Sequence, residues 1–531
     1  MVEHFELIVF GLLVSVAGLV LLSYTLNVPY PIFLVLGGLA LGFVPGIPKL
    51  ELEPELVLLI FLPPLLYSAA FFSSLRELQA NLRPIGLLSI GLVVLTMVVV
   101  AGVAHWAVGL SWPVAFVLGA IISPTDPVAA TATAERLGVP RRIVTVLEGE
   151  SLINDGTGLV LYRTALGVAM GEAFSFLDVG LRFVGNVVGG IAIGLAVGVL
   201  IAALRRRIKE PLVEITITLF TPYAAYLPAE ELGASGVLAA VTAGIYLGWH
   251  APRLTSPSTR LQSFSVWNVL TFLLNSILFI LMGLQLPAIL EEPPGGPVTT
   301  LALDAALVCL AAIVIRFAWV FPVTYIPRKF SRRLRQQDPS PPWQNVTVIA
   351  YAGMRGAVSL AAALALPFAL PDRDLVIFLT FSVIFVTLVV QGLTLPPLIR
   401  WLDLQDDSAP EEEETIARRQ AAEAALERIE ELEDEEWVYQ DTAQRMRDLY
   451  DYRRRRFTAR QSGDDGPVGD VDGSGEEDYE ARSEAFKRFR RELIEAERET
   501  VLRLRSEGKI GDEVMRQIER DLDLEESRLE V

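Results

Sequence analysis

Residues 1–402 contain thirteen runs of about twenty mainly apolar residues, separated by short polar or Pro- and Gly-rich breaks. A helix needs about 20 apolar residues to cross the roughly 30 Å hydrocarbon layer of a bilayer. The pattern therefore predicts an all-α membrane protein with about 13 transmembrane helices, at 5–24, 29–47, 55–72, 84–109, 112–133, 144–169, 178–204, 212–228, 233–249, 264–289, 298–325, 345–369 and 374–400. The first run is too long for a signal peptide and lacks a basic start, so we expect it to be a span.

Basic residues in the loops between these runs predict the orientation of the chain. Sixteen Lys and Arg residues fall in alternate loops, whereas Lys49 and Arg373 are the basic residues of the opposite loops. Lys and Arg concentrate on the cytoplasmic side of membrane proteins. We therefore expect a multi-pass protein of the cell membrane, with its N-terminus outside and its C-terminal tail in the cytoplasm.

The net charge of −18 belongs to the end of the chain. Residues 403–531 hold 40 acidic and 22 basic residues, whereas residues 1–402 hold 23 of each. We therefore expect a transmembrane domain at 1–402 and an acidic cytoplasmic tail at 403–531. Strong helix formers predict helices at 411–460 and 479–528, and glycines among acids predict a flexible linker at 462–478. Sparse apolar positions predict solvated helices, for which a solubilising and a regulatory role are both open.

The chain has very few cysteine and histidine residues, the usual ligands of zinc and other transition metals. One cysteine, Cys309, and three histidines exclude a cysteine zinc site and leave almost no imidazole ligands. The tail shows no nucleotide-binding or metal motif. We therefore expect no cofactor and no nucleic-acid partner.

The sixth run contains acidic residues near its middle. The segment 148–157 reads EGESLINDGT, and Asp155 lies about 16 Å into the run at about 1.5 Å per residue, close to the bilayer midplane. Ser151 and Asp155 are four residues apart and share a helix face, and Asn154 is three residues after Ser151. Their oxygens are the hard ligands that a dehydrated alkali cation needs. The pattern predicts a cation site around Asp155.

The fifth and twelfth runs each contain a helix-breaking motif. Residues 123–127 read SPTDP, and residues 352–357 read AGMRGA around Arg355. Backbone groups freed by such breaks must line a cavity, because lipid cannot satisfy them. The two runs cross the membrane in opposite directions, which is typical of inverted-repeat secondary transporters. Asp126 can cap the second half-helix or bind the ion, and Arg355 can neutralise the negative helix ends.

Glu150 and Arg316 are further charges within apolar runs. A charge at that depth is expensive and usually marks a partner or a transport path. Two roles are open for Glu150, a structural ion pair with Arg316 or direct binding of the ion, and we favour the ion pair.

Three motifs occur in order within residues 1–402: SPTDPVAA at 123–130, EGESLINDGT at 148–157 and GMRGAVSL at 353–360. Together they resemble the monovalent cation/proton antiporter family, and in particular its bacterial NhaP-type sodium/proton exchangers. The resemblance implies a homodimer in the lipid bilayer with the NhaA-like fold, in which two discontinuous helices cross. It also implies that Asp155 binds Na⁺ and a proton in turn, while Ser151, Thr125 and Asp126 help to build the ion site.

The same resemblance implies how exchange runs. Asn154 before Asp155 matches exchangers thought to be electroneutral, so we expect one Na⁺ or Li⁺ to be exchanged for one H⁺ by alternating access, for pH and sodium homeostasis. Glu150 would pair with Arg316 rather than Arg355. One departure is Ser68, at a position where several archaeal relatives carry an acid. The site therefore has one anionic ligand fewer, which leaves the choice among sodium, lithium and potassium open.

Other functions remain to be weighed. Potassium/proton antiport is the main competitor. A passive cation channel would use similar oxygens but would not need two oppositely directed broken helices. An intramembrane hydrolase with Ser151 or Ser359 as nucleophile lacks a nearby histidine or lysine to activate either serine. We therefore expect a transporter and not an enzyme.

Overall fold

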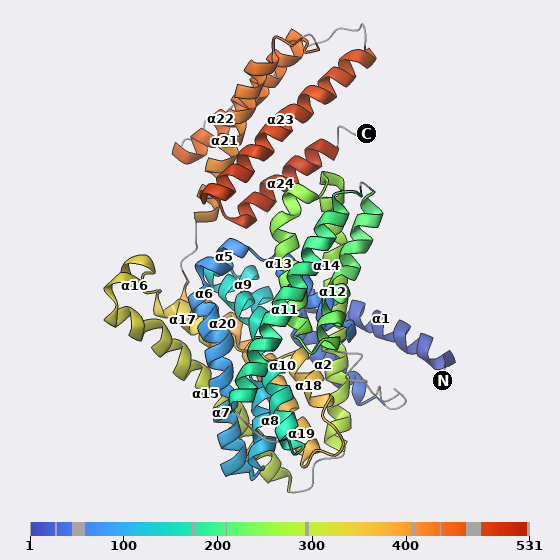
Figure 1. Cartoon of the computed structure of the whole chain (residues 1–531), viewed down its shortest axis with the longest axis vertical. Coiled ribbons are helices and arrows are strands. Elements are labelled where there is room, and N and C mark those ends of the chain that lie inside the picture. Colours follow the sequence, from blue (N-terminus) through green and yellow to red (C-terminus); the bar gives the residue numbers. More distant parts are fainter. Residues whose placement is uncertain are drawn as a thin grey trace. The chain divides into compact units, whose positions relative to one another are not determined.

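The computed structural model describes residues 2–26, 29–44, 59–172, 176–208, 210–291, 297–404, 409–435, 437–462 and 479–527. All regular elements in these ranges are helices (Figure 1), which confirms the predicted all-α class. Residues 463–478 of the predicted linker lie outside the described residues. The chain divides into two compact units, one of Met1–Lys209, Val213–Leu254 and Val266–Asp406, the other of Glu210–Leu212, Thr255–Ser265 and Asp407–Val531.

The helices before residue 403 belong wholly or mainly to the first unit. In chain order they are α1 (Val2–Leu26), α2 (Tyr30–Gly42), α4 (Leu62–Phe72), α5 (Leu75–Ala80), α6 (Leu82–Gly86), α7 (Val93–Val103), α8 (Trp112–Ile122), α9 (Val128–Arg136), α10 (Arg141–Ala169), α11 (Phe176–Arg205), α12 (Pro211–Glu231), α13 (Gly236–Leu254), α14 (Pro257–Glu291), α15 (Val298–Phe330), α16 (Arg332–Gln337), α17 (Trp343–Tyr351), α18 (Ala357–Leu364), α19 (Arg373–Phe385) and α20 (Gly392–Leu402). Three π-helical stretches join neighbouring α-helices or end one: η1 (Leu87–Leu92), η2 (Ala104–Val108) and η3 (Val386–Gln391).

Within the described residues, each predicted apolar run overlaps one or more of these helices. Within the described residues, five helices are long and apolar enough to cross a membrane: Leu82–Val108, Gly180–Arg205, Thr259–Gln285, Val298–Phe330 and Arg373–Leu402. Four shorter apolar helices accompany them. Two further predicted spans do not meet this criterion. The α10 helix has 29 residues but carries several charges, and α8 has only 11 residues. The count of thirteen spans therefore stays a prediction.

Two of the predicted runs are interrupted where the sequence places helix breakers. The chain is not helical between α8 and α9, because Pro124 and Pro127 lack a backbone N–H and disfavour helix just before each ring. It is not helical either between α17 and α18, where Gly353 and Gly356 flank Arg355. These interruptions place polar backbone groups inside the first unit.

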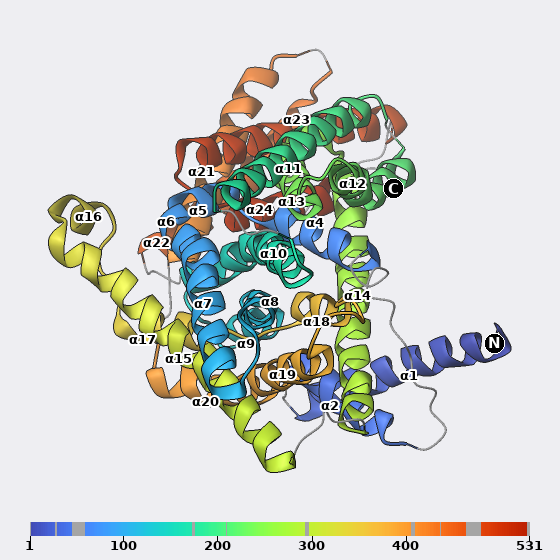
Figure 2. The same cartoon turned by 60° about the horizontal axis from the view of Figure 1, so that its bottom comes forward.

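The interrupted helices lie in a tightly packed group. Figure 2 shows α8, α10, α18 and α19 side by side, and α7 and α15 pack against members of this group. A large apolar cluster fills the space between them, with Leu118, Leu147 and Leu379 among its buried side chains. The core therefore surrounds the two breaks.

A second group consists of α4, α11, α12 and α13. The α13 helix packs against both α4 and α11, and alanines of α12 and α13 share an apolar cluster. Helix backbones touch here, since a Cβ on Gly248 would lie 2.2 Å from the Phe71 carbonyl oxygen, and one on Gly194 2.3 Å from that of Ala239. Small residues permit such close approach of helices in membrane proteins.

The second unit contains α21 (Ala409–Leu432), α22 (Gln440–Ser462), α23 (Tyr479–Glu507) and α24 (Asp512–Ser527). The sequence predicts helix over 411–460, and the structure has two helices in this stretch, with a turn between α21 and α22 that packs them together. The turn lets Ile429 and Leu432 pack in one cluster with Met446 and Tyr450. A single straight helix would leave these side chains in water, so burial favours the hairpin.

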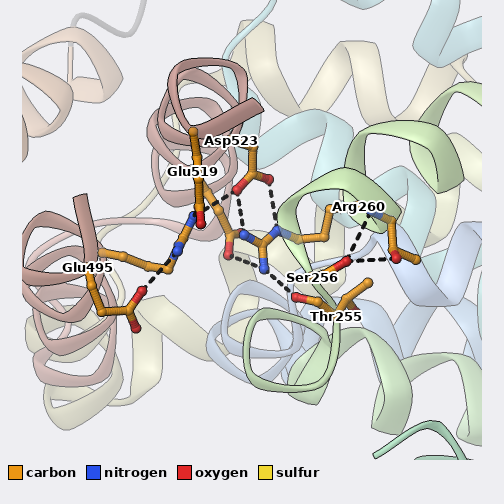
Figure 3. A network of polar contacts seen from close by, with 9 residues as sticks. Thr255, Ser256, Arg260, Glu495, Glu519 and Asp523 are labelled. Carbon is orange, nitrogen blue, oxygen red and sulfur yellow. Dashed lines mark hydrogen bonds and ion pairs between the residues drawn. The ribbon is translucent and has the colours of Figure 1, made fainter. Parts of the chain in front are cut away.

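Arg260 lies at the centre of a polar network in the second unit (Figure 3). Its guanidinium donates to both carboxylate oxygens of Asp523, at 2.8 and 2.5 Å, and lies 3.4 Å from the Glu519 carboxylate. Arg498 donates to the same Asp523 carboxylate at 3.0 Å. The Asp523 side chain is 2% exposed. One buried carboxylate therefore holds two arginines, from the 255–265 segment and from α23.

The network predicts that Asp523→Asn loosens α24. The change leaves two neighbouring guanidinium groups without their shared counter-charge, which we expect to cost about 2 kcal/mol. Hydrogen–deuterium exchange on the full-length protein should then be roughly 30-fold faster in α24. Asp521→Asn is the matched control, because Asp521 is half exposed where it pairs with Arg418 and surface pairs contribute little. Equal exchange rates in the two variants would contradict the prediction.

Candidate functional site

The two non-helical stretches of the first unit meet at Asp126. Its backbone N–H donates to the carbonyl oxygen of Met354 at 2.7 Å. Its carboxylate accepts the N–H of Val128, the first residue of α9, at 2.9 Å, and it also interacts with the N–H of Ala357, the first residue of α18. The anion therefore lies at the N-termini of two half-helices, where the helix dipoles favour negative charge. This geometry supports the capping role for Asp126.

Arg355 balances the carbonyl ends at the same crossing. Its guanidinium donates to the carbonyl oxygens of Ile122 at 3.1 Å, of Ala312 at 3.3 Å, and of Gly353. Its backbone N–H donates to the Thr387 hydroxyl at 3.1 Å. The residue is 2% exposed and is not among the described residues that line the cavity considered below. Two of these carbonyls, Ile122 and Gly353, lie at the breaks, where they lack helical partners, and the third belongs to the continuous α15 helix.

A buried chain of polar contacts ties α10 to the first break and to α15. Arg316 and Glu150 form a two-pronged ion pair, with both side chains 2% exposed. The Thr125 hydroxyl donates to Glu150 at 3.0 Å and accepts the Asn154 amide at 2.8 Å. Arg316 also donates to the Ile349 carbonyl oxygen. The structure thus brings Glu150 and Arg316 together, as the sequence suggested, with Thr125 and Asn154 in the same chain.

A cavity of about 310 Å³ lies beside the crossing. Asp155, Ser151, Thr125 and Asp126 line it, together with residues of α4, α14 and α18. The Asp155 residue is 7% exposed. Asn154 is fully buried and is not among the described residues of the cavity wall. Four of the five predicted ion-binding residues therefore line one cavity. The fifth, Asn154, contacts the cavity residue Thr125 through a hydrogen bond.

Other polar residues of the cavity wall were outside the predicted ion site. Glu148 lies seven residues before Asp155 on α10, so its two-turn spacing could have identified it from the sequence. Asn275 of α14 and Ser359 of α18 come from distant segments that the fold brings to the cavity. Ser68 of α4 also lines it. The hydroxyl, amide and carboxylate oxygens of these residues therefore gather from α4, α10, α14, α18 and the first break, a donor set that suits a hard cation.

Comparison with known proteins identifies the family. Residues 11–401 match the family model described as sodium/hydrogen exchanger, transmembrane. The chain belongs to this family. Its members are membrane-embedded exchangers and not enzymes, so the hydrolase interpretation is excluded.

Relatives of the exchanger match nearly the whole chain or about three quarters of it. The Na⁺/H⁺ exchanger Rv2287 of Mycobacterium tuberculosis is 38% identical over 98% of this chain and 97% of its own length. The Na⁺/H⁺ antiporter ApNhaP of Aphanothece halophytica is 38% identical over 76% of each chain. The sodium proton antiporter MjNhaP1 of Methanocaldococcus jannaschii has a similar fold, with a TM-score of 0.58, 19% identity, and coverage of 75% of this chain and 99% of its own.

The crossing predicts that Gly356→Ala disrupts the exchanger. A Cβ on Gly356 would lie 1.8 Å from the Asp126 carboxylate oxygen, and the buried carboxylate has little room to move. We expect an overpacking cost of about 3 kcal/mol, measured as lower thermal stability in detergent, and loss of exchange. Gly180→Ala on α11 is the control, because nothing lies within 4 Å of its added methyl. Normal stability of Gly356→Ala would contradict this crossing geometry.

The ion pair predicts a stability defect for Glu150→Gln. The change leaves the buried Arg316 guanidinium without a counter-charge, which typically costs about 3–5 kcal/mol. Combining it with Arg316→Met should recover much of the thermal stability, because neither charge then remains. Glu77→Gln is the control, since its pair with Arg141 is about one-quarter exposed. A stable Glu150→Gln protein with weakened Na⁺ affinity would instead identify Glu150 as an ion ligand.

Proposed function

We propose that this exchanger is a sodium/proton antiporter in which Asp155 binds Na⁺ and a proton in turn. The observation that carries the proposal is the nearly buried Asp155 in the wall of a cavity that also has hydroxyl and amide groups in its lining and lies beside two helix breaks. Relatives whose names describe Na⁺/H⁺ antiporters support it. The hydroxyls of Thr125 and Ser151 add neutral oxygen ligands, with Asp126 as a nearby negative charge.

Competition for one carboxylate is sufficient for exchange. A proton on Asp155 removes the charge that attracts Na⁺, and bound Na⁺ occupies the oxygens that would take the proton. Each ligand therefore weakens the other by the same factor, as thermodynamic linkage requires. If the site opens to one side of the membrane at a time, a downhill proton flux drives Na⁺ the opposite way.

The charges near Asp155 support a ratio of one to one. Asn154 adds no second carboxylate next to Asp155, and Glu150 is already paired with Arg316. The Asp126 carboxylate accepts a backbone N–H at the start of a half-helix. Loading Asp155 with one Na⁺ or one H⁺ therefore gives the same net charge. Exchange is then electroneutral, and an imposed membrane potential leaves its rate unchanged. Na⁺ and H⁺ are substrates here and no cofactor takes part.

We further propose the topology that the loop charges predict. Residues 1–402 form the antiporter domain with thirteen spans in inverted repeats and two crossed discontinuous helices, as in NhaA-like folds. The N-terminus lies outside, residues 403–531 form a cytoplasmic tail, and the protein works as a homodimer in the plasma membrane. The distribution of Lys and Arg among the loops supports this arrangement.

Asp155→Asn tests the central assignment. The amide cannot take up a proton or supply the negative charge, so we expect exchange in proteoliposomes to fall to the level of empty vesicles. The pH change inside the vesicles after addition of Na⁺, Li⁺ or K⁺ is the measurement. Asp304→Asn is the matched control, because Asp304 is equally buried but is not among the described residues of the cavity wall.

The outcomes separate the alternatives. Retained exchange by a folded Asp155→Asn protein would contradict the proposal. Exchange of wild-type protein with K⁺ but not with Na⁺ would favour potassium/proton antiport. Ion flux that needs no counter-ion would indicate a channel.

A further inference from the structure

One wall of the cavity contains a buried hydroxyl group without a hydrogen-bond partner. Among the described side chains, several buried polar atoms lack such a partner, including Oγ of Ser359, Oγ of Ser276 and Oδ1 of Asn154. Of these atoms, the Ser359 hydroxyl is the one whose residue lines the cavity that Asp155 faces. Ser359 is 2% exposed. Ser359 therefore places a hydroxyl group near the candidate ion site, and this hydroxyl makes no hydrogen bond.

The helix break explains why this hydroxyl is unpaired. A serine in a helix usually donates to the carbonyl three or four residues earlier, as Ser68 does to Leu65 at 2.9 Å. Ser359 is the third residue of α18, so the residue four positions earlier, Arg355, lies in the non-helical stretch. Gly356, three positions earlier, is the N-cap residue, and its carbonyl oxygen already accepts the Leu360 N–H at 3.2 Å. The Ser359 hydroxyl bonds to neither carbonyl.

An unpaired buried hydroxyl is unfavourable unless something else binds it. In an apolar pocket it would be a defect, but this cavity also contains a carboxylate and the hydroxyls of Ser151 and Thr125. A cation held at Asp155 needs several neutral oxygens to replace its water. The Ser359 hydroxyl is such an oxygen. It belongs to α18 of one interrupted helix, whereas Thr125 belongs to the other interrupted helix.

We propose that Ser359 contributes its hydroxyl oxygen to the exchanged cation, so that the ion takes ligands from both interrupted helices. This inference rests on the proposed role of Asp155. The proposed role of Ser359 affects the binding of the cation but not the binding of the proton. The cation needs the Ser359 oxygen as a ligand, whereas a proton on Asp155 is held by a covalent bond and does not.

Ser359→Ala tests the assignment through a KM measurement at two pH values. The KM for Na⁺ in proteoliposomes should rise about tenfold, the effect of losing one hydrogen-bond-strength ligand. The maximal rate should stay within about twofold. Because proton competition is untouched, the ratio of KM values at the two pH values should match that of the wild-type protein.

Ser276→Ala is the matched control. Ser276 is fully buried and its hydroxyl also lacks a partner, but the residue is not among the described ones that line the cavity. Its KM should stay at the wild-type value. A KM for Ser359→Ala within twofold of wild type, or an equal rise in Ser276→Ala, would overturn the inference.

Stability provides a second readout. Ser359→Ala removes an unpaired buried hydroxyl, so the unfolding temperature in Na⁺-free buffer should stay at or slightly above the wild-type value. The increase in unfolding temperature on adding Na⁺ should become smaller. Ser359→Cys replaces the oxygen with a soft sulfur of similar size and should also raise KM, and Ser359→Thr should keep it low. A wild-type response of the Cys variant to Na⁺ would overturn the inference. If Asp155→Asn abolishes exchange in that case, the proposed function stands and this inference alone fails.

Discussion

The hydrogen bond from the Asp126 N–H to the Met354 carbonyl joins two stretches of chain that would otherwise leave polar backbone groups in an apolar interior. No surrounding lipid could satisfy those groups, so each break must find its partners within the protein. Asp126 provides a negative charge where two half-helices begin, and Arg355 provides donors where helices end. The cavity and the Asp155 carboxylate depend on this crossing. The breaks place polar groups next to the cavity, and the hydrogen bonds of Asp126 and Arg355 satisfy backbone groups at the breaks.

Charge pairing around the crossing determines which group remains available. The Glu150 carboxylate is occupied by Arg316 and Thr125, and the Arg355 guanidinium by three carbonyls. Asp155 faces the cavity instead. A buried charged group that is fully paired keeps its protonation state and binds no further ion. A carboxylate in the wall of a cavity can instead bind a proton or a cation in turn.

The sequence predicted those parts of the site that depend on local chemistry. The prolines at 124 and 127 located one break, and the spacing of Ser151 and Asp155 placed both on the cavity face of α10. It did not reveal that Asn154 points away from that face to hold Thr125, nor that Ser359 is unpaired, since both depend on a second helix. In the tail, the sparse apolar residues suggested solvated helices, yet α21 and α22 bury them against each other.

The glycines of the second helix group affect how the cavity can change. Where Gly248 meets Phe71 and Gly194 meets Ala239, backbones touch directly, so α4, α11 and α13 have almost no room to move against one another. The cavity wall combines α4 of that block with α10 and α18 of the other group. It therefore lies where the two helix groups meet, and there Leu66 of α4 and Leu152 of α10 share an apolar cluster. A small shear between the two groups would change the shape of the cavity and slide these apolar side chains past one another, while the close backbone contacts within the second group stay in place.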